Sequence, residues 1–448
     1  MVLDRIHRIH LKGDLGRAER LYKEFLQGSP PDPLAEHLLG TLYLQQNQNG
    51  LAARHLRRAL EMQKTTQNYT NLLVALRGLG RAEEAVEIGQ EAIYLWGREH
   101  KELKSFYSNL ASCHMELGQY DVADTILRAV IDMDKDDIDA NWNHGVCQLT
   151  QGNLEAGWAG YDFGFKAKER GAPEYFNEFK EWLGEDLTGK TILIWGEQGL
   201  GDEILFANVL NDVIKVAGRV ILDCHPRLEE LFKRSFACEV VGGRKDKTRG
   251  RWDHEHIDLH CPIGSLPRFF RSELSDFPKQ GYLKADPARV KYWRTAIPGF
   301  KVGLAWMGGV HKTGRNMRSI ALRDLLPPID NVSFVSLQYG HVYEEVSQFP
   351  IYHNEGVIED FTELANLTAA CDLVISVIQT SVHLAGALDV PTWCLTPYAP
   401  PWKFMKGERI PWHPSVKQYH QEKRGDWTPV VNRIHSDLLR LVEERIAA

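Results

Sequence analysis

The sequence has no run of about 18 apolar residues, and its first residues, MVLDRIHRIHLKGD, contain no apolar core of signal-peptide length. We therefore expect neither a membrane span nor an export signal. The seven cysteines are scattered and never form a C-x-x-C pair, which favours reduced thiols and a cytoplasmic location. Positive charge is not in excess either: the net charge of −7 argues against broad nucleic-acid binding.

What the sequence does contain is ordinary for a globular protein of more than one domain. Its 448 residues suffice for two to four domains, and 43% of them are hydrophobic and 25% charged. The periodicity changes along the chain, from helical spacing in residues 1–165 to short β-rich runs from Lys190 onward. We therefore expect an α-helical part followed by an α/β part.

A repeat of about 34 residues fills the first part. The segments KGDLGRAERL, QNQNGLAARHL, LGRAEEAVEI, LGQYDVADTI and QGNLEAGWAG align at steps of 34, 33, 38 and 34 residues, which brings five small residues into register: Ala18, Ala52, Ala85, Ala123 and Gly157. Five residues earlier, four copies have a glycine and one has an asparagine: Gly13, Asn47, Gly80, Gly118 and Gly152. This pattern predicts helical hairpins that bury their apolar faces by stacking on one another. The 38-residue step predicts an insertion near Trp96–Leu103.

These segments resemble tetratricopeptide repeats, in about five somewhat degenerate copies. The resemblance implies a helical solenoid over residues 1–165. The groove of such an array more often holds a peptide or protein partner than serves as a plain spacer, and both uses stay open here.

Aromatic residues gather at the end of the last copy and in the junction, residues 166–188. The aromatic side chains are Trp158, Tyr161, Phe163, Phe165, Tyr175, Phe176, Phe179 and Trp182. We expect them to pack between the repeats and the next domain and to make the junction rigid. A carbohydrate-stacking platform is the alternative.

Alternating strand-like and helical runs predict βαβ units with parallel sheets after the junction. A first unit, residues 189–285, has candidate strands from Thr191 (TILIW) and Arg219 (RVILDC), and a run that ends near Leu259. A second unit, residues 286–428, has four candidate strands, which begin at Lys301, Val332, Asp372 and Thr392. Residues 270–293 are expected to connect the two units.

The last segment, residues 429–448, has helical spacing of apolar residues. The apolar positions are Val430, Ile434, Leu438, Leu441 and Val442. We expect a C-terminal helix that packs back across the two α/β units.

The stretch 191–210, TILIWGEQGLGDEILFANVL, predicts a strand, a glycine turn and a helix. Gly199 and Gly201 fit a dinucleotide-binding turn, and Asp223 ends the next strand where a ribose-binding acid would lie. Ile204, however, occupies the position of the third glycine, so the close helix–strand packing of that motif is not encoded.

Two acids also argue against a dinucleotide at this turn. Glu197 and Asp202 flank the place of a pyrophosphate and would repel it, and Asp202 already occupies the start of the helix. Taken alone, Asp202 would be a helix N-cap.

A resemblance gives Asp202 a second possible role. WGEQGLGDEI resembles the strand–turn–helix of glycosyltransferase family 9, the heptosyltransferase-like enzymes. It is closer still to bacterial proteins that fuse tetratricopeptide repeats to such a domain, whose entry WLGEDLTGK also matches. The resemblance implies the GT-B fold, two Rossmann-like units flanking a cleft, and assigns Asp202 as the base that deprotonates the acceptor. The overall plan is similar to O-linked N-acetylglucosamine transferase.

A basic loop follows the first strand of the second unit, in GLAWMGGVHKTGRNMRSIALRDL. Cations aimed at a leaving nucleoside diphosphate stabilise its growing negative charge. The family pattern has a basic residue in this loop and an Arg-Ser before the next helix, which Lys312, Arg318 and Ser319 match. We expect phosphate contacts from Lys312 and Arg318 more than from Arg315; a solvated basic loop is the alternative.

A hydroxyl-bearing turn follows the strand that ends at Val377, in DLVISVIQTSVHLAGALDVPTW. Thr380 and Ser381 precede His383 at a helix start, where hydroxyls and free backbone N–H groups bind anions. The family has Asp-Thr-Ser-Val-Ala-His or close variants here, and this chain matches it from His383 onward.

The same turn departs from the family pattern at Ile378 and Gln379, which stand where Asp-Thr is usual. A role of that acid is therefore absent or taken over by Gln379. His383 is expected either to contact a phosphate or sugar or simply to pack.

Two further segments allow more than one interpretation. In PYAPPWKFMKGERIPWHPSVKQYH, Trp402 either stacks on a nucleotide base or packs. The segment WDHEHIDLHC offers possible metal ligands, namely Asp253, His254, His256, His260 and Cys261. On a strand the histidines would share one solvated edge, and HCPIGSLP resembles a loop of the family, so we favour a structural or acceptor-side role and expect no metal.

These features together predict an inverting, metal-independent glycosyltransferase that uses a nucleotide-sugar donor and no separate cofactor. Asp202 takes the acceptor proton. The donor is expected to be held by residues of the two turns and of the basic loop, namely Gly199, Gly201, Lys312, Arg318, Ser319, Gln379, Thr380, Ser381 and His383. The repeats would present a polypeptide or glycan acceptor, as in protein glycosylation. Two alternatives stay open: a glycan- or lipid-directed transferase whose repeats only recruit partners, and a non-catalytic repeat scaffold with a degenerate transferase domain.

Overall fold

The computed structural model describes residues 2–96, 103–171, 178–243, 252, 256–309, 315–327 and 329–447. The chain divides into two compact units, Met1–Cys147 and Gln148–Ala448. The finer domain boundaries expected from the sequence stay predictions. Among the helices in these ranges, none is both long and apolar enough to span a lipid bilayer.

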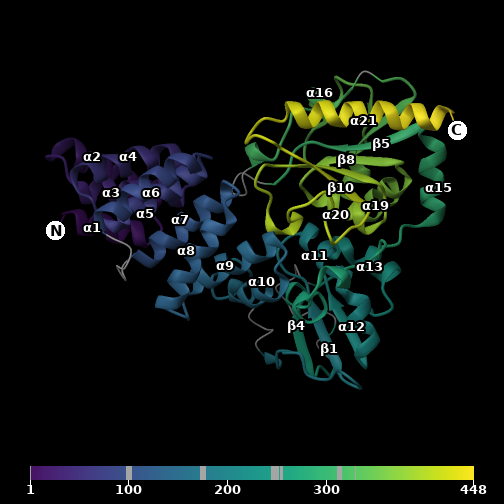
Figure 1. Ribbon diagram of the computed structural model, residues 1–448, viewed down its shortest axis with the longest axis horizontal. Helices are drawn as coiled ribbons and strands as arrows, with labels where there is room; N and C mark the ends of the chain where they lie inside the picture. Colours follow the sequence, from purple (N-terminus) through teal and green to yellow (C-terminus); the bar gives the residue numbers. More distant parts are fainter. Residues whose placement is uncertain are drawn as a thin grey trace. The chain divides into compact units, whose positions relative to one another are not determined.

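The first unit consists of helical hairpins that stack in chain order (Figure 1). Its helices are α1 (Val2–Leu11), α2 (Leu15–Gly28), α3 (Pro33–Gln45), α4 (Asn49–Met62), α5 (Thr66–Gly78), α6 (Ala82–Trp96), α7 (Lys104–Glu116) and α8 (Tyr120–Met133), and α9 (Ile138–Gln151) spans the division. Side-chain caps begin several of them: Asp14 accepts from Arg17 N, Asp32 from Ala35 N and Thr65 from Asn68 N. The predicted helical-hairpin repeat is thus confirmed.

The turns inside the hairpins explain the recurring glycine. All five positions have the left-handed backbone that ends a helix: Gly13 (φ 85°), Asn47 (φ 57°), Gly80 (φ 73°), Gly118 (φ 69°) and Gly152 (φ 84°). Glycine adopts this conformation without strain, and asparagine tolerates it better than most residues. Asn47 is therefore a conformational equivalent of the glycines in the other copies. Part of the expected insertion, residues 97–102, lies outside the described residues.

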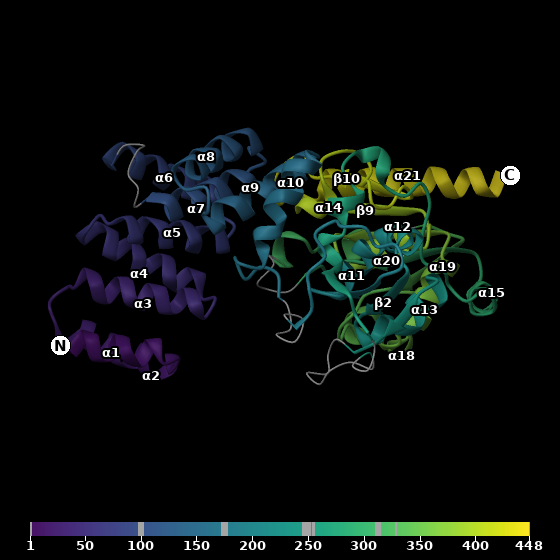
Figure 2. The same cartoon turned by 90° about the horizontal axis from the view of Figure 1, so that it is seen from below.

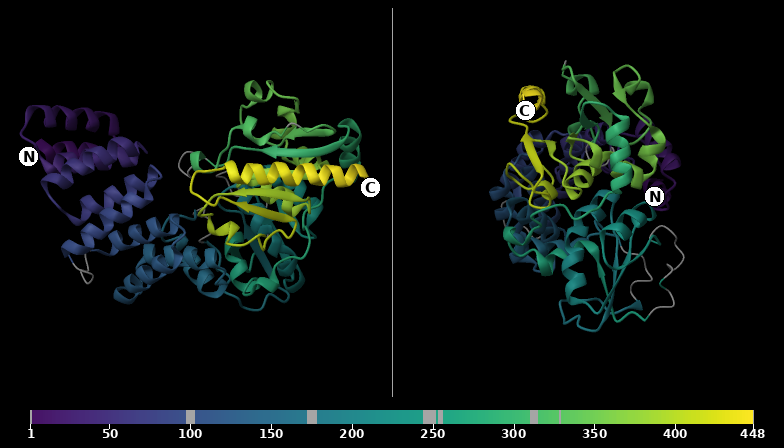
Figure 3. Two further views of the ribbon diagram at one scale, coloured as in Figure 1. Left: turned by 45° about the horizontal axis from the view of Figure 1, so that its top comes forward. Right: turned by 90° about the vertical axis from the view of Figure 1, so that its right-hand side faces the viewer.

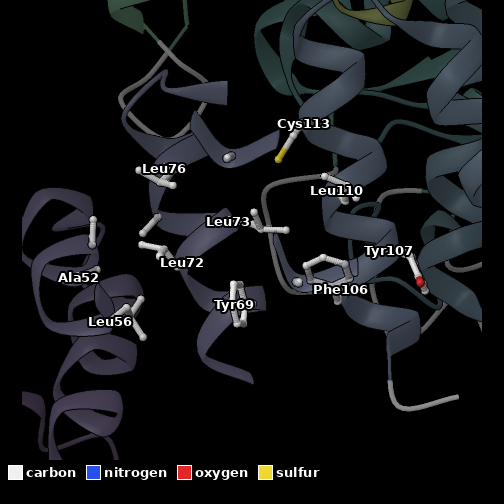
Figure 4. Close-up of a cluster of buried hydrophobic side chains, with 14 of the residues drawn as sticks. Ala52, Leu56, Tyr69, Leu72, Leu73, Leu76, Phe106, Tyr107, Leu110 and Cys113 are labelled. Carbon is white, nitrogen blue, oxygen red and sulfur yellow. The ribbon is translucent and has the colours of Figure 1, made fainter. Parts of the chain in front are cut away.

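The small residues in register lie where the helices pack closely. Ala18, Ala52, Ala85 and Ala123 are fully buried, and the side chains around them form one continuous core along the first unit. Figure 4 shows its middle part, where α4, α5 and α7 contribute Ala52, Leu56, Tyr69, Leu72, Leu73, Leu76, Phe106, Tyr107, Leu110 and Cys113. Each hairpin completes its neighbour's core, as the repeat period predicts.

The second unit starts with the end of α9, continues with α10 (Leu154–Tyr161) and contains two parallel sheets. The first sheet has the order β3-β2-β1-β4. Its strands are β1 (Thr191–Trp195), β2 (Arg219–Asp223), β3 (Glu239–Val241) and β4 (Leu259–Pro262), with helices α11 (Leu200–Phe206), α12 (Leu210–Val216), α13 (Glu229–Ser235) and α14 (Pro267–Phe270). In β1, four consecutive residues are buried, as expected for a central strand of a covered parallel sheet.

The second sheet has the order β10-β9-β8-β5-β6-β7, and all its pairs are parallel. Its strands are β5 (Phe300–Ala305), β6 (Val332–Ser336), β7 (Ile351–Tyr352), β8 (Leu373–Val377), β9 (Thr392–Thr396) and β10 (Val416–His420). The helices of this part are α15 (Pro287–Ala296), α16 (Leu322–Leu325), α17 (Tyr343–Val346), α18 (Glu355–Glu359), α19 (Phe361–Ala370), α20 (Thr380–Ala387) and α21 (Thr428–Ala447). The predicted fold class, helical repeats followed by two Rossmann-like units, is confirmed.

The last helix, α21, runs along the second sheet (Figure 3). Val430, Ile434, Leu438 and Val442 lie in the same core as β5 and β8, and Arg445 reaches Asp372 and the ring of Phe300. The apolar spacing therefore predicted the buried face of α21 correctly. These core contacts are made with the second sheet.

The aromatic residues near the junction pack inside the second unit. Trp158 is buried and donates its indole N–H to Arg271 O at 2.9 Å. Trp182 packs against Phe269, with the rings tilted to each other and their centroids 4.3 Å apart. Tyr175 and Phe176 lie outside the described residues. For Trp158 and Trp182, packing is the role that the structure shows.

Candidate functional site

The glycine turn after β1 places Asp202 in the first turn of α11. Gly199 is the N-cap of this helix and Asp202 is its third residue. Asp202 Oδ2 accepts a hydrogen bond from Gly199 N at 3.1 Å. The carboxylate therefore satisfies one free N–H at the helix start, from inside the helix and not from the N-cap position itself.

The second oxygen of Asp202 pairs with a lysine 201 residues further along the chain. Lys403, in the short 3-10 helix Trp402–Phe404 between β9 and β10, contacts Asp202 Oδ1 with its ammonium. Both side chains are about one-fifth exposed, 21% for Asp202 and 20% for Lys403. Burial alone would raise the pKa of Asp202, but Lys403, Gly199 N–H and His383 outweigh it and hold the pKa below its ordinary value.

A polar chain extends from this ion pair into the unit. Lys403 Nζ also donates to Gln198 Oε1 at 3.1 Å, and Gln198 Nε2 donates to Tyr161 Oη at 3.0 Å. Gln198 has a φ of 61°, a strained conformation for a non-glycine residue. These contacts fix the side chain of Gln198 beside Asp202, so the turn is held in one geometry.

Glu197, the other acid of the turn, is neutralised by Arg170. Arg170 Nε donates to Glu197 Oε2 at 2.8 Å and Nη2 to Oε1 at 2.5 Å, and both side chains are completely buried. Gly264 N donates to the same carboxylate at 3.0 Å. The expectation that Glu197 would repel a pyrophosphate was therefore wrong, because its charge is compensated within the fold.

The hydroxyl turn after β8 forms the start of α20. Gln379 is the N-cap and makes no side-chain cap hydrogen bond, and Thr380 is the first helical residue and half-buried. Ser381 is buried and donates to Leu337 O at 3.3 Å. Gln379 is buried too, and its Oε1 accepts no hydrogen bond from the described residues. The start of α20 thus retains backbone N–H groups that no side chain caps.

The two turns meet directly. α11 and α20 pack against each other (Figure 2), and a Cβ atom added to Gly201 would lie 3.0 Å from Thr380 Oγ1 and 3.5 Å from His383 Cδ2. Glycine at this position permits that approach. Asp202 and the start of α20, separated by nearly 180 residues of sequence, are therefore brought together at the ends of β1 and β8.

His383 lies on the inner side of this contact. Its Nδ1 is 3.2 Å from His413 Nε2, and both rings are buried. Burial lowers the pKa of His383 to about 4, although nearby Asp202 acts in the opposite direction. Burial also lowers the pKa of His413 well below its ordinary value. Two neutral rings then share one hydrogen bond.

Two polar side chains, Gln338 and Ser319, hold the backbone that follows β5. Gln338 Oε1 accepts from Trp306 N at 2.9 Å and Met307 N at 2.8 Å. Ser319 Oγ donates to Arg315 O at 2.8 Å and accepts from Gly308 N at 3.3 Å. Ser319 therefore shapes the basic loop through its backbone.

Arg318 is half-buried beside this loop, and burial lowers the pKa of its guanidinium. Among the residues that the structure describes, no carboxylate pairs with it within 4.0 Å. Arg315 is exposed and its Nη2 contacts Met307 Sδ at 3.2 Å. Lys312 lies outside the described residues. Between the two described cations of the basic loop, Arg318 is thus the one whose charged form an anionic ligand would stabilise more.

Trp402 lies in a buried aromatic cluster, next to Lys403. Its ring centroid lies 5.1 Å from Tyr161, 5.7 Å from Trp158 and 6.0 Å from Trp412, and 6% of the residue is exposed. Of the two roles considered for Trp402, packing is the one that the structure displays.

Asp223, the possible ribose-binding acid, uses its carboxylate inside the fold. Oδ1 accepts from Gly243 N at 3.0 Å and Oδ2 from Trp252 Nε1 at 3.1 Å. Both oxygens are therefore committed to protein donors, which weakens the dinucleotide interpretation further.

The histidine-rich segment is only partly described, since Asp253 and His254 lie outside the described residues. His260 is buried and accepts from Trp195 Nε1 at 3.1 Å, whereas His256 is exposed and pairs with Asp258 at 2.9 Å. Within the described ranges, no three His, Cys, Asp or Glu side chains form a group that could hold a metal ion. The described histidines thus have separate structural partners.

A surface hollow of about 350 Å³ lies elsewhere in the unit, between β10 and α21. It is lined by Glu408, Lys417, Gln418, Tyr419, Arg433, Ser436 and Asp437. Two of its charged side chains, Lys417 and Asp437, pair with each other at 3.6 Å. Chemistry is better supported at the meeting of the two turns than at this hollow.

Sequence reasoning missed two residues of this arrangement, Lys403 and Arg170. Each lies in an aromatic-rich segment, and each forms its ion pair with an acid of the same glycine turn that is distant in the sequence. A charge in the middle of PPWKFM is a usable signal, because a buried or half-buried cation needs a partner.

Comparisons with known proteins identify the repeats of the helical part. Residues 37–100 and 105–137 match tetratricopeptide repeat families. Two solved repeat proteins are similar to this part. TTC0263, a thermophilic TPR protein of Thermus thermophilus, is 20% identical with a TM-score of 0.32, and the match covers 39% of this chain and 92% of TTC0263. YrrB, a TPR protein with an unusual peptide-binding site, is 20% identical with a TM-score of 0.30, and the match covers 38% of this chain and 85% of YrrB.

A relative covers both parts of the chain. Protein FlbA of Caulobacter vibrioides is 30% identical to this chain, and the match covers 95% of this chain and 82% of FlbA. The similarity therefore includes the α/β unit as well as the repeats. The chain belongs to the same family as Protein FlbA.

Proposed function

We propose that this protein is a glycosyltransferase that moves a sugar from a nucleotide-sugar donor to an acceptor hydroxyl, with inversion and without a metal. The observation that carries the proposal is the direct meeting of two turns at the carboxyl ends of β1 and β8. One turn presents the Asp202 carboxylate, and the other presents the uncapped start of α20. A carboxylate can take the proton of the acceptor, and a helix start can bind the departing diphosphate. The transfer needs both groups close together.

These positions support the following proposed reaction. As the acceptor oxygen bonds to the anomeric carbon, Asp202 takes its proton, and the bond from that carbon to the phosphate oxygen breaks. The electron pair leaves with the nucleoside diphosphate, whose charge is stabilised by the N–H groups of α20, by Thr380 and by Arg318. Lys312 is expected to contribute from the basic loop. Holding donor and acceptor together in one geometry supplies part of the rate.

The repeats belong to the same proposal. A tetratricopeptide array is a protein-interaction scaffold, so we propose that it presents a polypeptide, or a glycan carried by one, to the α/β unit. All seven cysteines are free thiols, which accords with the cytoplasmic location that we propose.

A scaffold without catalysis is the second candidate. Two observations favour it. Ile378 and Gln379 stand where the heptosyltransferase-like enzymes usually have Asp-Thr, and the carboxylate of Asp202 is already paired with Lys403. Under this alternative the repeats carry the function and the α/β unit binds no donor.

A thermal-shift panel separates the two candidates. The full chain is heated with UDP-, GDP-, ADP- and dTDP-sugars, and the transferase proposal expects one of them to raise the melting temperature, by mass action. Asp202→Asn should retain that shift and lose transfer of the sugar. No shift with any donor at millimolar concentration would favour the scaffold, and unchanged transfer by Asp202→Asn would remove Asp202 as the base.

A further inference from the structure

The ion pair between Asp202 and Lys403 links the two halves of the candidate site. Asp202 belongs to the helix after β1, and Lys403 belongs to the segment between β9 and β10. The ammonium contacts Asp202 Oδ1 and lies 3.1 Å from Gln198 Oε1. Its two partners are thus both on the turn that carries the proposed base.

The pair also lies beside the proposed diphosphate site. Gly201, adjacent to Asp202, approaches Thr380 and His383 in the first turn of α20. A diphosphate at the start of α20 would therefore approach the Lys403 ammonium. The side chain of Lys403 is one-fifth exposed, so it can change partner without opening the core.

A carboxylate paired with an ammonium is a poor general base, because the pairing stabilises its unprotonated form. Resting on the function proposed above, we propose that Lys403 is a partner-exchanging residue, which holds Asp202 in the free protein and transfers to the donor diphosphate when the nucleotide sugar binds. The exchange releases Asp202 to accept the acceptor proton and gives the leaving group a cation. Base activation is thereby coupled to donor occupancy.

The groups around Asp202 determine how its titration responds. Lys403 faces it from the β9–β10 segment, His383 from α20, and Tyr161 through Gln198 from α10. Behind His383 lies His413, which burial keeps neutral. Of the groups that lower the pKa of Asp202, Lys403 has the largest effect. If Lys403 moved from Asp202 to a bound anion, the pKa of Asp202 would therefore rise.

The first test measures binding of nucleoside diphosphates alone, with UDP, GDP, ADP and dTDP as probes. For the probe that binds the wild-type chain, Lys403→Met should weaken binding roughly ten- to a hundredfold, the range expected for losing one charge-assisted hydrogen bond. Lys403→Arg should restore most of the affinity. Lys406→Met, at an exposed position on the same segment, serves as the matched control and should leave binding unchanged.

A double-mutant cycle tests the exchange itself. Asp202→Asn should tighten nucleoside diphosphate binding several-fold, since Lys403 no longer has to leave a carboxylate. This gain should largely disappear in the Lys403→Met background. An equal gain in both backgrounds would mean that Asp202 simply repels the anion, and would overturn the exchange.

The pH profile of transfer supplies a readout that a structural role would not move. In the wild type, the acid limb of kcat, which reports the complex, should lie at higher pH than that of kcat/KM, which reports the free protein. In Lys403→Met the kcat/KM limb should shift upward and the gap should close. If the wild type binds no diphosphate, the proposed function fails; if it binds and transfers but Lys403→Met matches it, only the exchange fails.

Discussion

Replacing Arg170 should destabilise the second unit more than replacing any surface arginine of the same network. The Arg170 guanidinium is completely buried, makes two hydrogen bonds to Glu197 and one to Ser265 at 2.9 Å, and lies 4.0 Å over the ring of Phe165. Arg170→Met retains much of the side-chain volume but leaves the Glu197 carboxylate buried without its cation. Breaking a buried pair in this way costs about 3–5 kcal/mol of unfolding free energy.

Equilibrium urea unfolding of the full chain, followed by tryptophan fluorescence, measures this cost. The signal comes mainly from the second unit, because every tryptophan except Trp96 and Trp142 lies there. Arg268→Met is the control: Arg268 pairs with Asp162 but is 48% exposed, so its loss should cost at most about 1 kcal/mol. Adding Glu197→Gln to Arg170→Met should recover part of the loss. Equal costs for the two arginines, or no recovery, would refute the reasoning.

Two other predictions concern the repeats and the histidine pair. Asn47→Ala should destabilise the first unit by about 1 kcal/mol, because alanine tolerates a φ of 57° poorly, whereas Asn47→Gly should be neutral or stabilising; a larger loss for glycine in thermal unfolding would contradict this. The pKa of His383 is about 4 in the folded chain, below that of an unfolded histidine, so the unfolded state binds more protons between about pH 6.5 and 4 and stability should fall as the pH is lowered through that range. His413, whose pKa burial also lowers, should contribute in the same direction. Unfolding free energies measured at several pH values should therefore show a weaker acid dependence for His383→Gln/His413→Gln than for the wild type, and identical dependences would contradict this assignment.

The elements with a strong periodic signal were predictable from sequence. The strand predicted from Thr191 is β1, residue for residue, and the strand predicted from Arg219 covers β2. Both are central, buried strands whose apolar runs follow directly from their position in a covered parallel sheet. The recurring alanine and glycine of the repeats were equally informative, because close packing and left-handed turns each admit few residue types.

Short strands at the sheet edges were missed or misplaced: the run expected to end near Leu259 ends where β4 begins. β3 and β7 have only three and two residues, and β10, VKQYH, follows a proline-rich segment and has no regular alternation of polar and apolar residues. Most of α15 falls in residues 270–293, for which the sequence predicts only a connector. Such elements form because a neighbouring strand or helix offers a partner, and a local pattern carries little of that information.

The candidate site divides along the same line. The turn at Asp202 and the turn at Thr380 each have a local signature, so both were found, and their meeting followed from the expected pairing of two Rossmann-like units. Arg170 and Lys403 have no signature of that kind, since each is defined by an acid it meets only in the folded chain.

The two missed cations change how the glycine turn works. From the sequence, the turn has two uncompensated acids, which would repel a pyrophosphate. In the structure Arg170 compensates Glu197 permanently, with no exposed surface on either side chain, whereas Lys403 compensates Asp202 from a position that solvent still reaches. One acid is thus locked as a structural member of the fold. The other has a partner that solvent reaches, and this difference in burial is why we propose Asp202, and not Glu197, as the catalytic base.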